Sequence, residues 1–490
     1  MPTTLENRVK STLPENDEHP YRSGAWTPNF EEYTATDLEV IGEIPTDISG
    51  VYLRNTENPV HTSIGKYHPF DGDGMLHMMR FSNGKAEYRN RFVRTRGFEA
   101  EAEANGPLWV GMAGKPEKSK RPGWGAHEHL KDSSSTDVTV HAGKALSTFW
   151  QCGEGYRLDP YTLDNLGIEA WTPVDGISAH PKVDEHSGEL LFFNYSKHAP
   201  YMHYGVVGAD NRLKHYVPVE LPGPRLPHDM AFSKNYSILN DFPMFWHEEL
   251  LKQNMHVPVM HDMPSRFGVI PRFGQPEDIR WFEGAPTYVL HWTNAWEEGD
   301  ELVLDGYFQN NPEPAPLDFG PEQYRHLYAF LNMHEVKPQL HRWRFNLKDG
   351  TTREEVLYDK EPVEFGTINQ QYAGVKNRYV YSTLLKKGWF LFTGLIKHDL
   401  ETGATQRYEF GDEIYASEAP FVPRENAKDE DDGYLVSFLT DMKRDRSSCV
   451  LLDAKNIEAG PVCEIVLPHR ICSGTHACWA SDQQITEGAG

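Results

Sequence analysis

The sequence predicts an all-β protein built as a closed β-propeller, and two features carry that prediction. Short strand-like segments bounded by turn residues recur along the chain, such as Leu190–Asn194 and Tyr434–Phe438. A second pattern, a strand, a turn containing Gly, Asn or Asp and another strand, is typical of a hairpin. It occurs at Met78–Phe92, Tyr156–Gly167, Arg342–Asp359, Leu395–Phe410 and Val450–Pro468. Many hairpins at irregular spacing favour a propeller over a β-sandwich or several β domains.

The domain organisation follows from the absence of a clear linker. A chain of 490 residues would ordinarily suggest several domains, but one closed ring of sheets can absorb that length. We expect a polar N-terminal extension at 1–34, a single propeller domain with inserted cap segments at 35–482 and a C-terminal tail at 483–490. Helices are expected at Pro321–His334 and Phe245–Gln253, in long insertions that would form a cap over one face.

Composition excludes several classes of protein. The formal charge is −24, so nucleic acid is disfavoured as a partner because phosphate binding needs clustered Lys and Arg. The one basic cluster, Lys115–Arg121, is short and is interpreted as a solvated loop. There is no apolar signal-peptide core and no transmembrane segment, and five scattered cysteines do not form a disulfide scaffold. A cytoplasmic location is the expectation.

Four histidines stand out because each comes just before a strand pattern. They are His180, His228, His291 and His476, which lie far apart along the chain. Strands of different propeller blades converge on the central axis, so these side chains are candidates to meet there. Neutral imidazoles are suitable ligands for Fe, Zn, Cu and Ni, and carboxylates usually orient them. The four histidines therefore predict a metal site.

The sequence disfavours two other kinds of metal site and a nucleotide site. Cys472, His476 and Cys478 resemble a local zinc cluster, but a structural zinc site needs a fourth ligand and no C-x-x-C motif is present. The iron arrangement of two histidines and one carboxylate often shows H-x-D, which this sequence lacks. The Gly-rich segment Phe70–Met75 fits neither dinucleotide nor P-loop motifs and is interpreted as a tight turn.

Several segments are distinctive when taken together. They are SAHP, LPHDM, LHWTNAWEEGDE and GTHACW around the four histidines, VYLRNTENPVHTSIGKYHPFDGDGMLHMMRF near the N-terminus and SEAPFVPR further along. With these segments the sequence resembles, from about Leu38 to Trp479, the carotenoid cleavage oxygenases, a family that also contains stilbene- and phenylpropene-cleaving enzymes. The resemblance implies a seven-bladed propeller with Fe(II) on its axis and a loop-and-helix dome that encloses a substrate tunnel. It also implies that O2 is added across an alkene to give two carbonyl products, without an organic cofactor.

The resemblance also implies roles for individual residues. His180, His228, His291 and His476 correspond to the iron ligands. Glu364 and Glu418 correspond to carboxylates that hold ligand imidazoles. At the position of the family's third such Glu this chain has Gln151, whose carbonyl accepts a hydrogen bond but carries no charge. We expect a slightly less electron-rich iron, with His180 the ligand most affected.

The substrate is the most difficult inference. Thr136 aligns with a Thr near an open iron position in some relatives, although a Thr that satisfies a turn is an equal alternative. Stilbene- and phenylpropene-cleaving relatives hold the substrate phenol with a Tyr and a Lys, where this chain has Ala113 and Trp150. Because both polar groups are missing, a carotenoid or apocarotenoid is expected, and a stilbenoid or phenylpropenoid is the alternative.

Other functions stay open at this point. A propeller hydrolase or lactonase would use a divalent cation held mainly by carboxylates and amides. A non-catalytic binding protein or an isomerase on the same scaffold is a further alternative. An apolar alkene and O2 are the expected small-molecule partners. The sequence leaves peripheral membrane contact and the oligomeric state undetermined.

Overall fold

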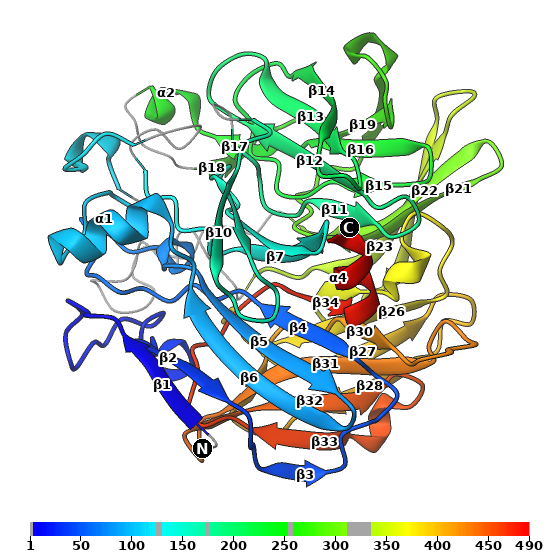
Figure 1. Ribbon diagram of the computed structural model, residues 1–490. Helices are drawn as coiled ribbons and strands as arrows, with labels where there is room; N and C mark the ends of the chain where they lie inside the picture. The colour runs from blue at the N-terminus through cyan, green and yellow to red at the C-terminus, as the bar shows by residue number, and fades with distance from the viewer. Residues whose placement is uncertain are drawn as a thin grey trace.

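The alternation of apolar and polar residues produces a structure made almost entirely of antiparallel strands. The computed structural model describes residues 3–112, 114–123, 130–172, 176–252, 258–310 and 335–489. Its first sheet is six-stranded, in the order β1-β2-β6-β5-β4-β34, so it joins the two ends of the chain (Figure 1). These strands are Thr3–Arg8, Glu31–Ala35, Lys85–Phe92, Met75–Ser82, Gly50–Arg54 and Ala477–Ser481.

Four four-stranded sheets follow in sequence order. The second sheet consists of β7 to β10, at Asp137–His141, Lys144–Thr148, Gly155–Leu158 and Asn165–Glu169. The third consists of β11 to β14, at Lys182–Asp184, Glu189–Tyr195, Tyr201–Val207 and Leu213–Glu220. The fourth consists of β15, β16, β19 and β20, at Ala231–Phe232, Tyr236–Asp241, Ser265–Pro271 and Arg280–Gly284. The fifth consists of β21 to β24, at Trp292–Glu298, Glu301–Phe308, Gln339–Asn346 and Thr352–Tyr358.

The last large sheet has ten strands. In sequence order they are β3, at Val40–Gly42, and β25 to β33, at Val363–Thr367, Tyr379–Leu385, Phe392–Asp399, Thr405–Glu409, Ile414–Ala416, Phe421–Pro423, Gly433–Asp441, Arg446–Asp453 and Pro461–Val466. The short strand β29 joins the two halves of this sheet, because it pairs with both β27 and β31. The predicted hairpins are confirmed here and in the other sheets, since β5–β6, β9–β10, β23–β24, β27–β28 and β32–β33 are all antiparallel pairs.

Helices are few among the described residues, and two of them were not predicted. The helix α1 spans Arg96–Ala104, and α4 spans Asp482–Gly488. The predicted helix Phe245–Gln253 is wrong over its first residues, since Met244–Trp246 is strand β17, which pairs with β18 (Pro258–Met260). Only α2, Glu248–Leu251, is helical there, because the aromatic pair Phe245–Trp246 suits a strand. The predicted helix at Pro321–His334 lies outside the described residues.

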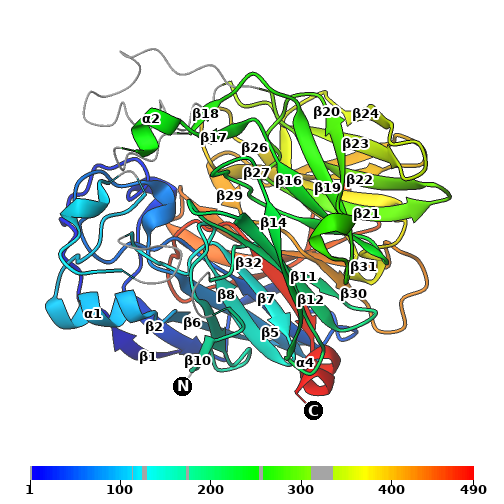
Figure 2. The same ribbon diagram turned by 90° about the horizontal axis from the view of Figure 1, so that it is seen from above.

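The two ends of the chain are built into regular structure. Strand β2 pairs with β1 and β6, so the boundary predicted at residue 34 falls inside a strand. The predicted tail largely coincides with α4, which lies near the middle of the view in Figure 1. After a 90° turn, α4 lies at one edge of the molecule and α2 at the opposite edge (Figure 2). No helix in the described ranges has the length and apolarity needed to cross a membrane.

The strands that lie at one end of the larger sheets position the candidate site. Strands β34, β7 and β11 lie next to one another from sheet to sheet, and so do β15, β21 and β25. Each of them is the terminal strand in its sheet's order. Residues just before these strands are therefore brought close together, although they are far apart in the sequence.

Candidate metal centre

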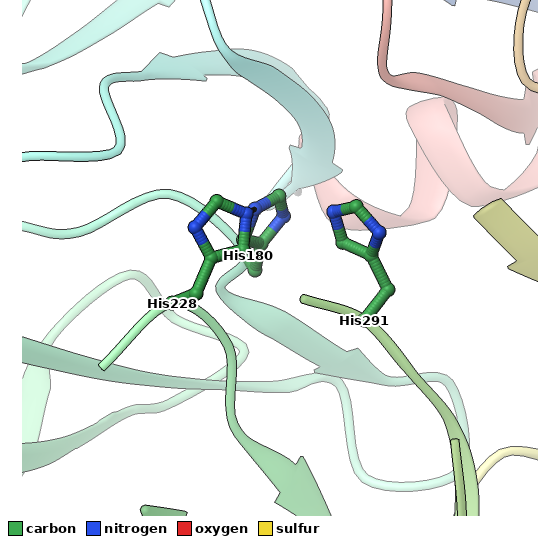
Figure 3. Close-up of side chains that lie close together, drawn as sticks. All are labelled: His180, His228 and His291. Carbon is green, nitrogen blue, oxygen red and sulfur yellow. Dashed lines mark hydrogen bonds between the residues drawn. The ribbon is translucent and has the colours of Figure 1, made fainter. Parts of the chain in front are cut away.

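The four predicted histidines come together just before the terminal strands. His291 and His476 directly precede β21 and β34, and His180 and His228 lie a few residues before β11 and β15. The ring centroid of His180 lies 4.9, 5.1 and 4.5 Å from those of His228, His291 and His476. His291 lies 5.3 Å from His228 and 4.6 Å from His476. Figure 3 shows the rings of His180, His228 and His291 turned toward one shared space.

The nitrogen atoms of these rings are arranged as a ligand set requires. His180 Nε2 lies 3.3 Å from His228 Nε2. The Nε2 atom of His291 is buried and makes no hydrogen bond among the described residues. Potential ligand atoms of His180, His228 and His291 all lie within 4.8 Å of one another. His180, His228 and His291 are therefore close enough to bind one ion.

Carboxylates hold the outer nitrogens of two rings. His291 Nδ1 lies 2.7 Å from Glu364 Oε2, and His476 Nδ1 lies 3.3 Å from Glu418 Oε2. A carboxylate acceptor keeps the proton on Nδ1, so Nε2 presents its lone pair inward.

The carboxylate nearest to His180 is one that the sequence did not indicate. Asp137 Oδ2 lies 3.2 Å from His180 Nδ1 and accepts the backbone N–H of His180 at 3.1 Å. Gln151, which was expected to act on His180, is half-buried and makes no hydrogen bond to the four histidines among the described residues. The structure therefore places Asp137, and not Gln151, beside His180.

A second acidic residue ties two histidine segments together. Asp229, which follows His228, accepts the backbone N–H of Trp292 at 2.9 Å. Trp292 in turn follows His291, so one carboxylate fixes the spacing of both segments. The other Asp229 oxygen lies 2.7 Å from Lys182 Nζ, which compensates its buried charge.

Burial favours uncharged imidazoles at this centre. It lowers the pKa of His228 to about 3 and that of His180 and His291 well below the ordinary value, and the neighbouring histidines add to the effect. Burial also acts to lower the pKa of His476, but the Glu418 carboxylate, together with Asp137 and Glu57, outweighs it and raises that pKa. Three of the four rings are therefore neutral at pH 7, which is the form that binds metals.

Known proteins that resemble this chain provide independent evidence. The family model described as retinal pigment epithelial membrane protein matches residues 26–481. A carotenoid 9,10(9',10')-cleavage dioxygenase of Arabidopsis thaliana is 34% identical, over 95% of this chain and 91% of that protein. An isoeugenol monooxygenase of Pseudomonas putida is 30% identical, over 96% and 99%. The crystal structure of Pseudomonas brassicacearum lignostilbene dioxygenase superposes with a TM-score of 0.84 at 25% identity, over 96% of this chain and all of the other.

The chain belongs to the carotenoid cleavage oxygenase family.

It is therefore an enzyme of the dioxygenase type, as predicted. The family depends on non-haem iron, and the histidine cluster has the donors to bind a metal. Neutral imidazoles with carboxylates on their outer nitrogens fit ferrous iron. No group of three or more ligands that includes Cys472 or Cys478 forms among the described residues, so the zinc alternative is not supported.

The histidines contact both a cavity and a group of aromatic side chains. The cavity, of about 680 Å³, reaches His180, His291 and His476 and is lined by polar and apolar residues alike, among them Lys182 and Trp292. The rings also contact aromatic side chains. Phe365 lies 4.5 Å from His291 and 4.7 Å from His476 between centroids, and Trp150 lies 6.2 Å from His228.

These aromatic contacts continue away from the histidines. Phe390 lies 5.6 Å from Phe365, and Phe70 lies 5.7 Å from Phe390 and 6.0 Å from Trp150. The four rings form one continuous cluster in the hydrophobic core, which we call the aromatic wall: Phe70, Trp150, Phe365 and Phe390. Apolar ligand sites are built mainly from such side chains.

The remaining predicted site residues differ in where they lie. The hydroxyl of Thr136 accepts the backbone N–H of Trp150 at 3.2 Å, so its oxygen has a structural partner. Trp150 is buried and its indole N–H has no hydrogen-bond partner among the described residues. Ala113 lies outside the described residues.

Sequence reasoning missed Asp137, Asp229 and Phe365. The first two carry a usable signal, because Asp137 directly follows Thr136 and Asp229 directly follows His228. Phe365 follows Glu364 and has a left-handed backbone, with φ of 51°, which turns its ring onto the histidines. Only the folded backbone reveals that conformation.

Proposed function

We propose that this chain binds one ferrous ion through His180, His228, His291 and His476 and, with O2, cleaves a C=C bond of a carotenoid or apocarotenoid to give two carbonyl products. The observation that carries this proposal is the convergence of four imidazoles from distant segments, with Nε2 of His291 unpaired and Nε2 of His180 only 3.3 Å from that of His228. Bound iron would supply the activation of O2 at such a site.

The scaffold that we propose is a seven-bladed propeller. Five sheets each supply one blade, and the ten-stranded sheet supplies two when it is divided at β29. The inserted elements α1, α2, β17 and β18 would contribute to a cap over one face. This arrangement would place the histidines on the axis, where the terminal strands of neighbouring sheets meet.

The chain's own residues would bind the substrate through the aromatic wall. Flat aromatic surfaces favour an extended apolar polyene, and they exclude water from the scissile bond. Trp150 stands where phenol-reading relatives are expected to have a Lys, so nothing at that position would stabilise a phenolate. The relative at 34% identity is named for carotenoid cleavage, which agrees with this preference.

A stilbenoid or phenylpropenoid side chain is the second candidate substrate. It is favoured by the TM-score of 0.84 to a lignostilbene dioxygenase and by 30% identity to an isoeugenol monooxygenase. Both substrate classes would be cleaved at the same iron site. The preference between them would therefore depend only on the residues that hold the substrate.

Turnover assays on purified protein test the proposal. The protein is loaded with Fe(II) and mixed with an apocarotenal or a hydroxystilbene, while O2 consumption and aldehyde products are followed. We expect the apocarotenal to be split with O2 uptake, and His291→Ala to abolish both signals. Turnover of the stilbene alone would overturn the substrate class. Protein that holds calcium and hydrolyses esters would overturn the oxygenase itself.

A further inference from the structure

We infer that Asp137 is a positioning residue for His180, and that it provides the third carboxylate of the metal centre at a new place in the fold. The inference rests on the four-histidine centre proposed above. It goes beyond that proposal, because it assigns to Asp137 the role that Gln151 was expected to have in the sequence.

The arrangement at Asp137 repeats the arrangement at the other two carboxylates. Glu364 Oε2 faces His291 Nδ1 and accepts the N–H of Phe365 at 2.6 Å. Glu418 Oε2 faces His476 Nδ1 and accepts the N–H of Ala477 at 2.7 Å. In both cases one oxygen is shared between an imidazole and a backbone amide, which fixes the carboxylate in place.

Asp137 also places one oxygen against both an imidazole nitrogen and a backbone amide, with hydrogen-bond geometry to the amide. Its Oδ2 lies 3.2 Å from His180 Nδ1 and accepts the N–H of His180 itself, while Oδ1 accepts the N–H of Val138 at 2.7 Å. The side chains of Asp137 and His180 are 14% and 4% exposed, so water competes little for either contact. Asp137 also begins β7, and Asn55 Nδ2 donates to its carbonyl oxygen at 3.1 Å.

The backbone of His180 explains why an acceptor is needed here. Its φ is 64°, in the left-handed region that non-glycine residues rarely adopt. Such a conformation persists only where neighbouring contacts determine it. The bond from His180 N–H to Asp137 provides one such contact, and the same oxygen faces the ring.

The other charged groups nearby are already engaged. Lys182 lines the same cavity as Asp137, but its Nζ pairs with Asp229 at 2.7 Å. His228 is the one histidine of the four that has no carboxylate partner among the described residues. The centre therefore has three carboxylates, on His180, His291 and His476, and the ring without one is His228.

The test measures how tightly the protein binds metal when Asp137 is changed. Fe(II) affinity is determined by competition with a coloured chelator, and the visible spectrum of the Co(II)-loaded protein reports the ligand field. We expect Asp137→Ala to weaken Fe(II) binding about 10- to 100-fold, as loss of an orienting partner does elsewhere, and to shift the Co(II) bands. Asp137→Asn keeps the shape and one acceptor oxygen, so it should fall between Asp137→Ala and the unmodified protein.

Two further variants make the result decisive. Asp132→Asn is the matched control, because Asp132 is buried and accepts a backbone N–H from Glu154 at 2.9 Å but faces no site histidine. It should leave the metal affinity unchanged. Adding Gln151→Glu to the Asp137→Asn protein should not restore the Co(II) spectrum, since Gln151 makes no hydrogen bond to His180 in the part of the chain that the structure describes.

Failure of the inference and failure of the proposed centre give different results. If His180→Ala abolishes metal binding but both Asp137 variants bind Fe(II) as tightly as the unmodified protein with the same Co(II) spectrum, the role of Asp137 is overturned. If His180→Ala itself binds metal normally, the four-histidine centre is overturned. Because Asp137→Asn preserves the side-chain volume, its near-ultraviolet circular dichroism should match the unmodified protein and exclude misfolding.

Discussion

The outer nitrogen of each site histidine shows how single residues control the centre. An imidazole can present either nitrogen to a metal, and the partner of the other nitrogen decides which one. At His291 that partner is Glu364, at 2.7 Å and fully enclosed by protein. Removing it leaves the ring free to change tautomer or to rotate.

We therefore expect Glu364→Ala to weaken Fe(II) binding by about 10- to 100-fold. Competition with a coloured chelator measures the change. The control is Glu354→Ala, since Glu354 pairs with His341 at 3.2 Å outside the site. Equal affinities for the Glu364 variant and the control would contradict the role of Glu364.

A buried histidine away from the site makes stability depend on pH. His398 on β27 packs edge-on against Tyr358 at 4.8 Å, and burial lowers its pKa to about 4. In the unfolded chain the pKa lies near 6.5, so the unfolded state binds more protons between these two values. Stability is therefore present in full above pH 6.5 and is lost as the pH falls toward 4.

Because of His398, the free energy of unfolding should be about 2 kcal/mol lower at pH 5 than at pH 8. Replacing it by Phe keeps the ring and removes the titration. We expect His398→Phe to show a correspondingly smaller loss over that range in urea melts of the metal-free protein. An identical pH slope in the two proteins would refute the assignment.

At the scale of elements, α4 illustrates how a short helix depends on the capping residue that precedes it. Ser481 accepts the backbone N–H of Gln484 at 3.1 Å, and the Gln484 side chain accepts the N–H of Ser481 at 2.8 Å. This capping box satisfies two amides that the helix itself cannot. Residues of α4, among them Gln484 and Glu487, line the cavity that reaches His180, His291 and His476.

Loss of the cap should open this helix without disturbing the metal centre. We expect Ser481→Ala to destabilise α4 by about 1 kcal/mol, seen as faster hydrogen exchange of its amides. Ser481→Thr retains the hydroxyl and should exchange like the unmodified protein. Unchanged exchange in the Ala variant would show that packing of Ile485, and not the cap, holds α4 in place.

Elements also show where sequence patterns were sufficient. The hairpin Met78–Phe92 has a turn of Asn83 and Gly84 with positive φ at both, as the turn chemistry requires. In contrast, α1 was not anticipated, although Thr95 caps it by accepting the N–H of Phe98 at 2.9 Å. A strong local signal predicted the hairpin, whereas a single capping Thr was too weak to indicate the helix.

For the molecule as a whole, stability depends on joining the two ends of the chain. Strand β34 pairs with β4 over five residues, so the C-terminal strand completes the sheet that the N-terminal strands begin. The buried Arg54 reinforces this junction by donating to Cys472 O at 2.7 Å. His476 lies directly before β34, which couples closure of the sheet to the metal centre.

Removing residues 477–490 should therefore lower the unfolding free energy by about 3 kcal/mol or more, because several backbone hydrogen bonds at about 1 kcal/mol each are lost. It should also abolish metal binding, because His476 loses its strand. Thermal melts and metal analysis check both effects. A shorter deletion of 482–490 removes α4 but keeps β34, and it should retain the metal. Metal bound at full affinity without β34 would contradict this coupling.

The sequence by itself determined the strands, the hairpin turns and the identity of the four histidines, because those signals are local in the chain. The alternation of apolar and polar residues, Gly and Asn in turns, and the four histidines that come just before strand patterns can all be recognised without knowing the fold. Only the tertiary structure decided which carboxylate serves which ring. Asp137 and His180 are far apart in sequence, and no local pattern joins them. The same holds for the left-handed backbone at His180 and Phe365, since contacts between sheets, and not the preferences of those residues, fix their φ angles.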